Sequence, residues 1–442
     1  MKNYQNFYFV GIGGIGMSAL ARYFHAAGKN VLGYDKTETK LTTELQKEGI
    51  SITFEDVVDE KISSLKKEET LVIYTPAIKV LRILDYFNEN GFEVLKRAKV
   101  LGMITEDTNC IAVAGTHGKT TTSSLVAHLC KVANLPFSGF LGGIAENYKS
   151  NFIFNGTEMS VLEADEYDRS FLNLSPDWAI ITSIDADHLD IYGDTETIEQ
   201  GFRDFADLVP ENDQLFVRKG VNIGRPCKTY AVNEEADYYS DNLHIVDGWM
   251  MFDFHVGEQT VEFAWQIPGT HNVENATAAI AVLHNLGADF TAIQEGISSF
   301  KGIKRRYTKH TFENGKIYVD DYAHHPTELN AVIGSTKAFY PDKKLLVVFQ
   351  PHLFSRTKDF ADDFWYYFSD GDMIIKNEAD KIASKKLKYV NAMQFFKNQT
   401  SFLHGESYIE NDFGATVINS LSNLSNTGKL IKKEDLLELT NR

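Results

Sequence analysis

Two glycine-rich turns, each placed between an apolar strand pattern and a helix pattern, restrict most strongly how this chain can fold. The first is GIGGIG at 11–16, after the apolar run at 6–10, and the second is GTHGKT at 115–120, after the apolar run at 111–114. Strand, turn and helix in this order form one half of a crossover between parallel strands. The chain is therefore predicted to be an α/β protein with parallel sheets.

The first hundred residues repeat this alternation. After the first turn, a segment with helical apolar spacing is expected to bury Met17, Leu20, Ala21 and Phe24 on one face and to stop at Gly28. Strands are expected at 6–10, 30–35, 51–54, 70–75 and 93–96. This order predicts a doubly wound parallel sheet.

Two further blocks follow, in keeping with the roughly three domains that a chain of 442 residues suggests. The second block opens at 111 and has expected strands at 159–165 and 178–184. The third begins near Lys309 and has expected strands at 316–323 and 344–350. We place the domains at 1–107, 108–308 and 309–442.

The charge balance limits the class of partner. With 44 Lys and Arg against 61 Asp and Glu, the formal charge is -17, which argues against a general binder of nucleic acid or of anionic membranes. Small anionic ligands stay possible, because backbone N–H groups bind phosphate. The cysteines, Cys110, Cys130 and Cys227, lack metal or disulfide spacing and indicate buried thiols in a reducing compartment. No signal peptide or membrane-spanning run is apparent, so we expect a cytoplasmic protein without membrane insertion.

The first turn matches G-x-G-x-x-G, and Asp35 ends the next expected strand, where a ribose-binding acid belongs. This pattern indicates a nucleotide diphosphate site, and it does not distinguish NAD from other nucleotides. The alternative is a glycine turn that serves only close packing.

The second turn resembles a phosphate-binding loop, although its spacing is shorter than G-x-x-x-x-G-K-[ST]. Lys119 would reach the β and γ phosphates and the Thr120 hydroxyl would bind Mg²⁺. Thr120, Thr121 and Thr122 are poor helix formers, which a ligand explains better than helix propensity does. The alternative is a glycine-rich turn with a solvated lysine.

Acidic residues follow two expected strands of the second block. Glu163 and Asp165 end the strand at 159–165, and the segment DADHLD at 185–190 surrounds His188 with carboxylates. Oxygen ligands with one imidazole suit Mg²⁺ or Mn²⁺ better than Zn²⁺. Otherwise these acids are solvated loop residues.

Two segments of the third block also offer polar groups after strands. In DDYAHHPTE at 320–328, Pro326 suits a first helical position, so His324 and His325 either act chemically or cap the helix. In QPHLFSRT at 350–357, His352 is available and Arg356 would hold a carboxylate through two hydrogen bonds.

Taken together, these segments resemble the Mur ligases over roughly residues 5–360. The motifs that carry the resemblance are GIGGIGMSAL, GTHGKTTT, EADEYDRSF, DADHLDIYG, HNVENATAA, RRY, DDYAHHPTE and VFQPHLFSRT, in that order. The resemblance implies a Rossmann-like UDP-sugar domain at 1–107, a central P-loop ATPase domain with a mostly parallel sheet at 108–308, and a Rossmann-like amino-acid-binding domain at 309–442.

The resemblance also implies ligands for individual residues. The diphosphate of UDP-N-acetylmuramate, rather than NAD, would lie on the first loop, and ATP on the second, with its adenine near His271 and Asn275. Thr120 and Glu163 would hold one Mg²⁺, and Glu163 with His188 a second. The sugar-nucleotide residues would be Gly13, Gly14, Ile15, Gly16, Asp35, Thr75 and Arg97, with His352 and Arg356 on the substrate side. The ATP residues would be Gly115, Thr116, His117, Gly118, Lys119, Thr120 and Thr121.

The activity implied is ATP-dependent joining of L-alanine to the lactyl carboxylate of UDP-N-acetylmuramate, in peptidoglycan precursor synthesis. The carboxylate would attack the γ-phosphorus of ATP, and the amine would then displace phosphate from the acyl phosphate. Lys119, Glu163, His188, His324 and Arg356 would serve this chemistry. The alternatives are a ligase that adds a recycled peptide to the same sugar nucleotide, a catalytically impaired UDP-sugar and ATP binder, and an NAD-dependent oxidoreductase.

The chain departs from the family pattern in three places. Phe202 stands where several Mur ligases carry a carbamylated lysine, and Leu353 where many alanine-adding members have arginine. Beyond about residue 370 the usual Tyr-Pro-Ala-Arg and Gly-Ala-Gly-Asp segments are missing, so the last part of the chain is diverged or replaced.

Overall fold

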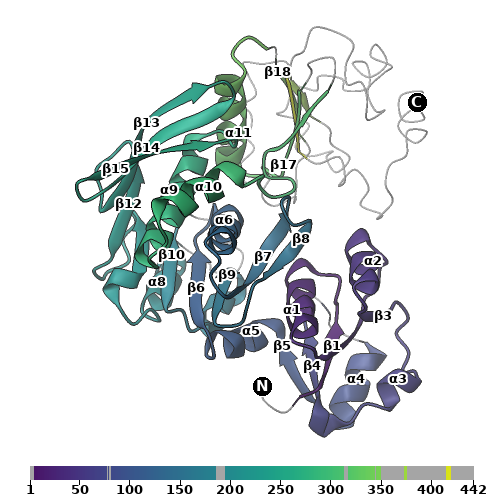
Figure 1. The fold of residues 1–442 in the computed structure, drawn as a ribbon. Coiled ribbons are helices and arrows are strands. Elements are labelled where there is room, and N and C mark those ends of the chain that lie inside the picture. Colours follow the sequence, from purple (N-terminus) through teal and green to yellow (C-terminus); the bar gives the residue numbers. More distant parts are fainter. Residues whose placement is uncertain are drawn as a thin grey trace, which may run out of the picture. The chain divides into compact units, whose positions relative to one another are not determined.

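A computed structural model describes residues 4–76, 78, 81–185, 195–312, 317–343, 345–349, 373–375 and 415–419. These residues form three sheets with helices between the strands (Figure 1). By contacts the chain divides into two compact units. The first comprises 1–243, 251–265 and 273–301, and the second comprises 244–250, 266–272 and 302–442. The predicted α/β class is confirmed.

The first sheet has the strand order β3-β2-β1-β4-β5, and its neighbouring strands are parallel. The strands are β1 (Asn6–Val10), β2 (Asn30–Tyr34), β3 (Ser51–Thr53), β4 (Thr70–Tyr74) and β5 (Glu93–Lys96), which confirms the five expected positions. The helices are α1 (Ile15–Ala26), α2 (Lys40–Lys47), α3 (Glu60–Ser63), α4 (Arg82–Glu89) and α5 (Arg97–Thr105), with the short 3₁₀ helix η1 (Lys67–Glu69). The order reverses between β1 and β4, where such sheets bind nucleotides.

Helix α1 has the predicted inward face. Met17, Leu20, Ala21 and Phe24 are all buried. The helix ends just before Gly28, whose φ of +75° lies in the left-handed region that glycine adopts without strain. The sequence pattern therefore placed this helix correctly.

The second sheet has the order β15-β14-β13-β12-β11-β10-β6-β9-β7-β8. Its central strands pair in parallel, whereas β7 and β8 form an antiparallel hairpin at one edge. The first half comprises β6 (Asn109–Ala114), α6 (Lys119–Val132), β7 (Phe137–Ala145), β8 (Ser150–Phe154), β9 (Met159–Glu163), the 3₁₀ helix η2 (Tyr167–Asn173) and β10 (Trp178–Ile181). The second half comprises α8 (Thr195–Ala206), η3 (Asn212–Gln214), β11 (Leu215–Arg218), β12 (Lys228–Val232), β13 (Tyr238–Val246), β14 (Trp249–Val256), β15 (Gln259–Trp265), α9 (Thr270–Asn285) and α10 (Phe290–Ser299).

The third sheet has the order β16-β17-β20-β18-β19, in which β16 and β17 pair antiparallel and the other neighbours pair in parallel. Its elements are β16 (Thr308–Thr311), β17 (Ile317–Asp321), α11 (Pro326–Phe339), β18 (Leu345–Phe349), β19 (Met373–Ile375) and β20 (Ala415–Asn419). Helix α11 begins at Pro326, as expected for a residue without a backbone N–H.

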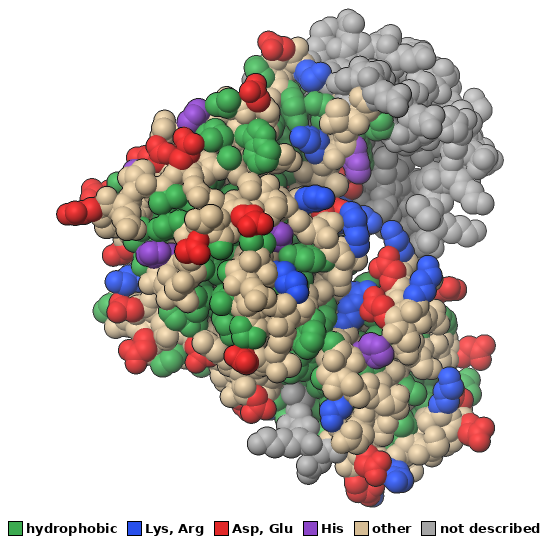
Figure 2. Space-filling model, viewed as in Figure 1, with side chains coloured by type: hydrophobic (Ala, Val, Ile, Leu, Met, Phe, Trp, Pro, Cys, Tyr) green, Lys and Arg blue, Asp and Glu red, His purple; other side chains and the backbone are tan. Residues whose placement is uncertain are grey.

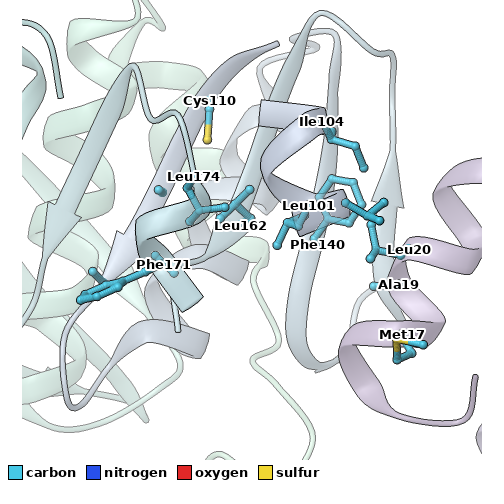
Figure 3. Packing of buried hydrophobic residues seen from close by; sticks show 14 of the residues in the cluster. Met17, Ala19, Leu20, Leu101, Ile104, Cys110, Phe140, Leu162, Phe171 and Leu174 are labelled. Atoms are coloured by element: carbon cyan, nitrogen blue, oxygen red, sulfur yellow. The ribbon is translucent and has the colours of Figure 1, made fainter. Parts of the chain in front are cut away.

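One hydrophobic cluster runs through the first two sheets. Met17, Ala19 and Leu20 of α1 belong to it together with Phe140 of β7 and Leu162 of β9 (Figure 3). The helix after the first glycine-rich loop therefore packs on the sheet that carries the second. This contact places the first loop beside the end of β9, where Glu163 accepts a hydrogen bond from Thr120 of the second loop.

The structure shows where the acidic side chains lie on the surface and how deeply the cysteines are buried. Asp and Glu side chains are spread over the visible face and gather over β13 to β15 (Figure 2). Cys110 and Cys130 are buried, and burial raises the pKa of each thiol to about 12. Cys227 is only partly buried, so its prediction as a buried thiol was wrong. It lies in the connection before β12 rather than in the sheet.

None of the helices in the described part of the chain has the length and apolar character needed to span a bilayer.

Candidate active site

The second glycine-rich loop has a backbone that its glycines make possible. Gly115 and Gly118 have φ angles of +133° and +83°. A Cβ atom on Gly115 would lie 2.0 Å from Oγ1 of Thr182, and one on Gly118 would lie 2.5 Å from Oδ1 of Asn275. Both positions therefore require glycine for conformation and for space.

The segment after β10 holds this loop in place. The backbone N–H of Thr116 donates to the carbonyl of Ser183 at 2.9 Å, and that of His117 donates to the Ser183 hydroxyl at 3.0 Å. The N–H of Asp185 donates to Oγ1 of Thr116 at 2.9 Å. The first residue of the predicted acidic segment thus anchors the loop. The loop opens α6, whose N-terminal N–H groups suit a phosphate.

Lys119 does not extend into solvent. Its Nζ donates to the carbonyl of Gly115 at 2.5 Å, to that of Thr116 at 3.2 Å, and to Oε1 of Glu166 at 2.9 Å. Burial lowers the pKa of Lys119, but the carboxylates of Glu166 and Glu163 more than offset this, and the pKa lies above its ordinary value. Lys119 is therefore a charged group.

Thr120 and Glu163, the proposed magnesium ligands, meet. The Thr120 hydroxyl donates to Oε2 of Glu163 at 2.9 Å. A Cβ at Gly142 of β7 would lie 1.9 Å from that oxygen, so glycine leaves the space that the carboxylate occupies. Two oxygen donors beside a phosphate loop fit Mg²⁺, which takes few protein ligands and completes its shell with phosphate and water.

The other proposed metal ligand is not placed. His188 lies outside the described residues, so its part in a second metal site stays a prediction. Within the described residues, no group of three or more His, Cys, Asp and Glu side chains is arranged to hold a metal. Phe202, which the resemblance aligns with the carbamylated lysine of several Mur ligases, lies in the core, 1% exposed and packed edge-on against Phe171.

A pocket of about 390 Å³ joins the first glycine-rich loop to the end of β9. Its polar lining comes from Thr75, Arg97, Glu163 and Asp165. Its complete lining is Gly14, Ile15, Gly16, Met17, Ala19, Leu20, Thr75, Arg97, Leu101, Phe140, Leu141, Gly142, Leu162, Glu163 and Asp165. The predicted sugar-nucleotide residues at 14–16, 75 and 97 thus line the same space as the proposed metal ligand Glu163.

Asp35 and Arg97 bear directly on the first loop. Oδ2 of Asp35 accepts the backbone N–H of Gly13 at 2.8 Å, which fixes the turn. A Cβ on Gly16 would lie 2.6 Å from Nη1 of Arg97, so glycine lets the guanidinium approach the N-terminus of α1. Nη2 of Arg97 also lies 4.0 Å from Oδ2 of Asp165. A cation beside a glycine-rich helix N-terminus is arranged for an anionic group.

The proposed adenine residues lie at the start of α9. Asn275 is buried beside Gly118, and its Oδ1 accepts the Thr122 hydroxyl at 3.1 Å. His271 is exposed at the first turn of the same helix. Thr122 is therefore bound within the protein, whereas Thr121 is only partly buried at the loop's end of α6.

In the third block, the two histidines differ. His325 is the N-cap of α11 and accepts the Thr327 N–H, so the capping alternative is confirmed for it. Nδ1 of His324 lies 2.7 Å from the Tyr322 carbonyl, which only accepts, so Nδ1 carries the proton. His352, Leu353 and Arg356 lie outside the described residues.

Comparison with known proteins decides the family. Residues 6–108 match the Mur ligase family catalytic domain, 113–283 the Mur ligase middle domain and 305–405 the Mur ligase glutamate ligase domain. This chain belongs to the Mur ligase family. The third match reaches past residue 370, where the usual motifs are missing.

Relatives of this Mur ligase include named enzymes. A UDP-N-acetylmuramate–L-alanine ligase of Flavobacterium psychrophilum is 48% identical over 379 residues, covering 85% of this chain and 84% of that protein. One from Christiangramia forsetii is 46% identical, covering 85% and 83%. The UDP-N-acetylmuramate-alanine ligase structure from Thermotoga maritima has a TM-score of 0.75 at 23% identity, with 99% of each chain covered. At that identity the structural likeness shows the fold.

One charged residue of this site was not predicted from the sequence. Glu166 forms the ion pair with Lys119. It is the third acid of the segment EADEYD at 163–168, in which the first two acids, Glu163 and Asp165, are the expected metal ligands. Gly142 was missed as well, because nothing in FLGGIA reveals a carboxylate beside it.

Proposed function

We propose that this Mur ligase joins L-alanine to the lactyl carboxylate of UDP-N-acetylmuramate, with ATP converted to ADP and phosphate, in peptidoglycan precursor synthesis. The relatives that cover most of the chain bear that activity in their names. Both nucleotides are cytoplasmic metabolites, so the reaction belongs in the cytoplasm.

One observation carries the proposal. A single pocket contains the first glycine-rich loop and Glu163, and Glu163 is hydrogen-bonded to Thr120 of the phosphate loop. A diphosphate at Gly14–Gly16, aided by Asp35, Thr75 and Arg97, would direct the sugar's carboxylate toward the ATP terminus. Aligning two reactants in this way accounts for a large part of the rate in such transfers.

The protein groups act by position and charge. Lys119 would bind the transferred phosphate, while the N–H groups at the start of α6 bind the neighbouring phosphates and His271 and Asn275 lie by the adenine. Mg²⁺ would be held by Thr120 and Glu163, with His188 for a second ion, and would neutralise charge on the phosphoryl group. The γ-phosphoryl group passes to the carboxylate, and the alanine nitrogen then forms the amide bond as phosphate leaves.

The amino acid would bind on the C-terminal domain. His324, His352 and Arg356 are the groups we propose there, with Arg356 paired to the carboxylate of alanine. Leu353 lacks the charge that many alanine-adding members have, so Arg356 would carry more of this binding.

The test is phosphate release with each component omitted in turn. We expect release from ATP only with both UDP-N-acetylmuramate and L-alanine, and a product whose mass equals their sum less one water. A peptide that outcompetes L-alanine would indicate the recycling ligase. Binding of both nucleotides without product would indicate the impaired paralogue, and binding of NADH at the first loop would indicate the oxidoreductase.

A further inference from the structure

We propose that Glu166 is a positioning residue that acts through Lys119: it holds the ammonium group in the nucleotide-free protein and gives it up to a nucleotide phosphate. The inference rests on the proposed function only in that the phosphate loop binds a nucleotide. It assigns to Glu166 a place in nucleotide affinity rather than in the metal site.

The hydrogen bonds of Lys119 support this exchange. An ammonium group has three donors. Two of them are engaged by the carbonyls of Gly115 and Thr116, which belong to the same loop. The remaining donor binds the Glu166 carboxylate. A phosphate that enters the loop must therefore displace Glu166 from the ammonium group of Lys119.

The backbone, rather than a flexible side chain alone, sets where Glu166 lies. The Tyr167 N–H donates to Oδ1 of Asp165 at 3.1 Å, and the Arg169 N–H donates to the carbonyl of Glu166 at 2.9 Å. The Phe171 N–H donates to the Asp165 carbonyl at 3.0 Å, and the Phe171 ring is 1% exposed. The turn at 165–171 is thus fixed to the hydrophobic core through Phe171.

The turn also contains strained backbone. Asp168 and Arg169 have φ angles of +53° and +52°, in the left-handed region that only about a few per cent of residues other than Gly adopt, with Asp among the more frequent types and Arg not. Consecutive residues of this kind persist where the surroundings impose them, often at functional sites. Here the imposed shape places a carboxylate on the phosphate loop.

Burial acts on the pair in two ways: it strengthens the hydrogen bond, and it raises the pKa of Glu166 by more than Lys119 lowers it. The side chains of Lys119 and Glu166 are 13% and 5% exposed, and Nζ lies 2.9 Å from Oε2. A charge-assisted hydrogen bond out of water is stronger than a surface ion pair. Part of the free energy of nucleotide binding is therefore spent on opening this pair.

The first experiment measures the affinity for Mg²⁺ and a non-hydrolysable ATP analogue by calorimetry. Glu166→Gln should lower the Kd about tenfold or more, because breaking a hydrogen bond between Lys119 and a neutral amide costs less free energy than breaking the ion pair. Glu166→Asp keeps the charge and should give an intermediate Kd. Asp168→Asn removes the same charge from the same turn at an exposed position and should leave the Kd unchanged.

Turnover separates this role from a catalytic one. Because the pair exists before the nucleotide binds, Glu166→Gln should lower the KM for ATP and change kcat by less than about threefold. A Kd that is unchanged or higher in Glu166→Gln, or a kcat that falls without any change in Kd, would overturn the proposal.

A second readout needs no activity. Acetylation of Lys119 in the nucleotide-free protein, followed by mass spectrometry, should be faster in Glu166→Gln than in the wild type and Asp168→Asn, because the ion pair protects the amine. Equal rates would contradict the pair. Absence of ligation with UDP-N-acetylmuramate and alanine, by contrast, would contradict the proposed function and leave these two measurements standing.

Discussion

Arg22 of α1 donates a hydrogen bond from Nη1 to Oδ1 of Asn151 in β8, and both side chains are buried. Nδ2 of Asn151 in turn donates to the Ile15 carbonyl and to the Ser18 hydroxyl. The amide of one residue in the second sheet therefore fastens the first turn of the helix that follows the first glycine-rich loop. These hydrogen bonds are directional, so they orient α1 on the second sheet in a way that the surrounding hydrophobic packing does not.

Replacing that amide should destabilise the protein. Asn151→Leu keeps the branched shape and the number of heavy atoms but leaves the buried Arg22 guanidinium and Ile15 carbonyl without this partner, at a cost of about 3 kcal/mol. We expect a lower midpoint for the first thermal transition of the chain. Glu48→Gln is the control: Glu48 also binds Arg22 but is 40% exposed, so its substitution should cost clearly less. Equal losses in the two variants would show that Asn151 has no special role.

His128 predicts a pH dependence of stability. Nδ1 lies 2.7 Å from the Tyr148 hydroxyl and Nε2 lies 3.0 Å from that of Ser299, and burial lowers the pKa of His128 to about 4. Below the unfolded pKa of about 6.5 the unfolded chain binds the extra proton, so stability is complete above that pH and falls as pH drops toward 4. The loss should reach about 3 kcal/mol, at about 1.4 kcal/mol per pKa unit.

Denaturant titrations from pH 7 to pH 4.5 measure this term. His128→Gln keeps a polar group on α6 but does not titrate, so its stability should fall less over the same range. His255, an 18% exposed histidine on β14 that pairs with Asp241, offers the control variant His255→Gln. If the wild type and His128→Gln lost stability in parallel, the buried histidine would not be the titrating group.

Lys119→Ala should reduce turnover at saturating ATP by at least about 100-fold, by analogy with the loss of one preorganised charge-stabilising donor. The affinity for UDP-N-acetylmuramate should barely change, because Lys119 does not line the pocket. The variant also strands the buried Glu166 carboxylate, so its stability should fall. The double variant Lys119→Ala/Glu166→Gln should regain stability but not turnover. Retention of more than half of the turnover in Lys119→Ala would refute the assignment.

Glu163→Gln should raise the Mg²⁺ concentration needed for half-maximal activity about tenfold or more, since it removes the carboxylate beside Thr120. Gly142→Ala should act in the same direction, because its Cβ would lie 1.9 Å from Oε2 of Glu163. Glu158→Gln makes the same change at an exposed position just before β9 and should have no effect. An unchanged Mg²⁺ titration in the first two variants would show that Glu163 is only a solvated acid.

Many features of this protein could be predicted from its sequence because they depend on local chemistry. The apolar period of α1, the glycines with positive φ at 28, 115 and 118, and Pro326 at the start of α11 act on their own backbone or on the next few residues. Strand positions in the first sheet followed for the same reason. The family motifs added the ligands, because each motif is a short continuous segment.

Tertiary structure decided what depends on partners far apart in the chain. The sequence did not indicate that Glu166 rather than solvent would meet Lys119, 47 positions away, or that Asn151 would bind α1. The β7–β8 hairpin and the strands from β11 to β15 were likewise not predicted, since their pairing depends on which sheet edge is available. Pattern and propensity act over a few residues, whereas burial and charge pairing depend on which surfaces the folded chain brings together. For that reason the sequence determined the loops and their chemistry, and the fold determined which side chain each loop meets.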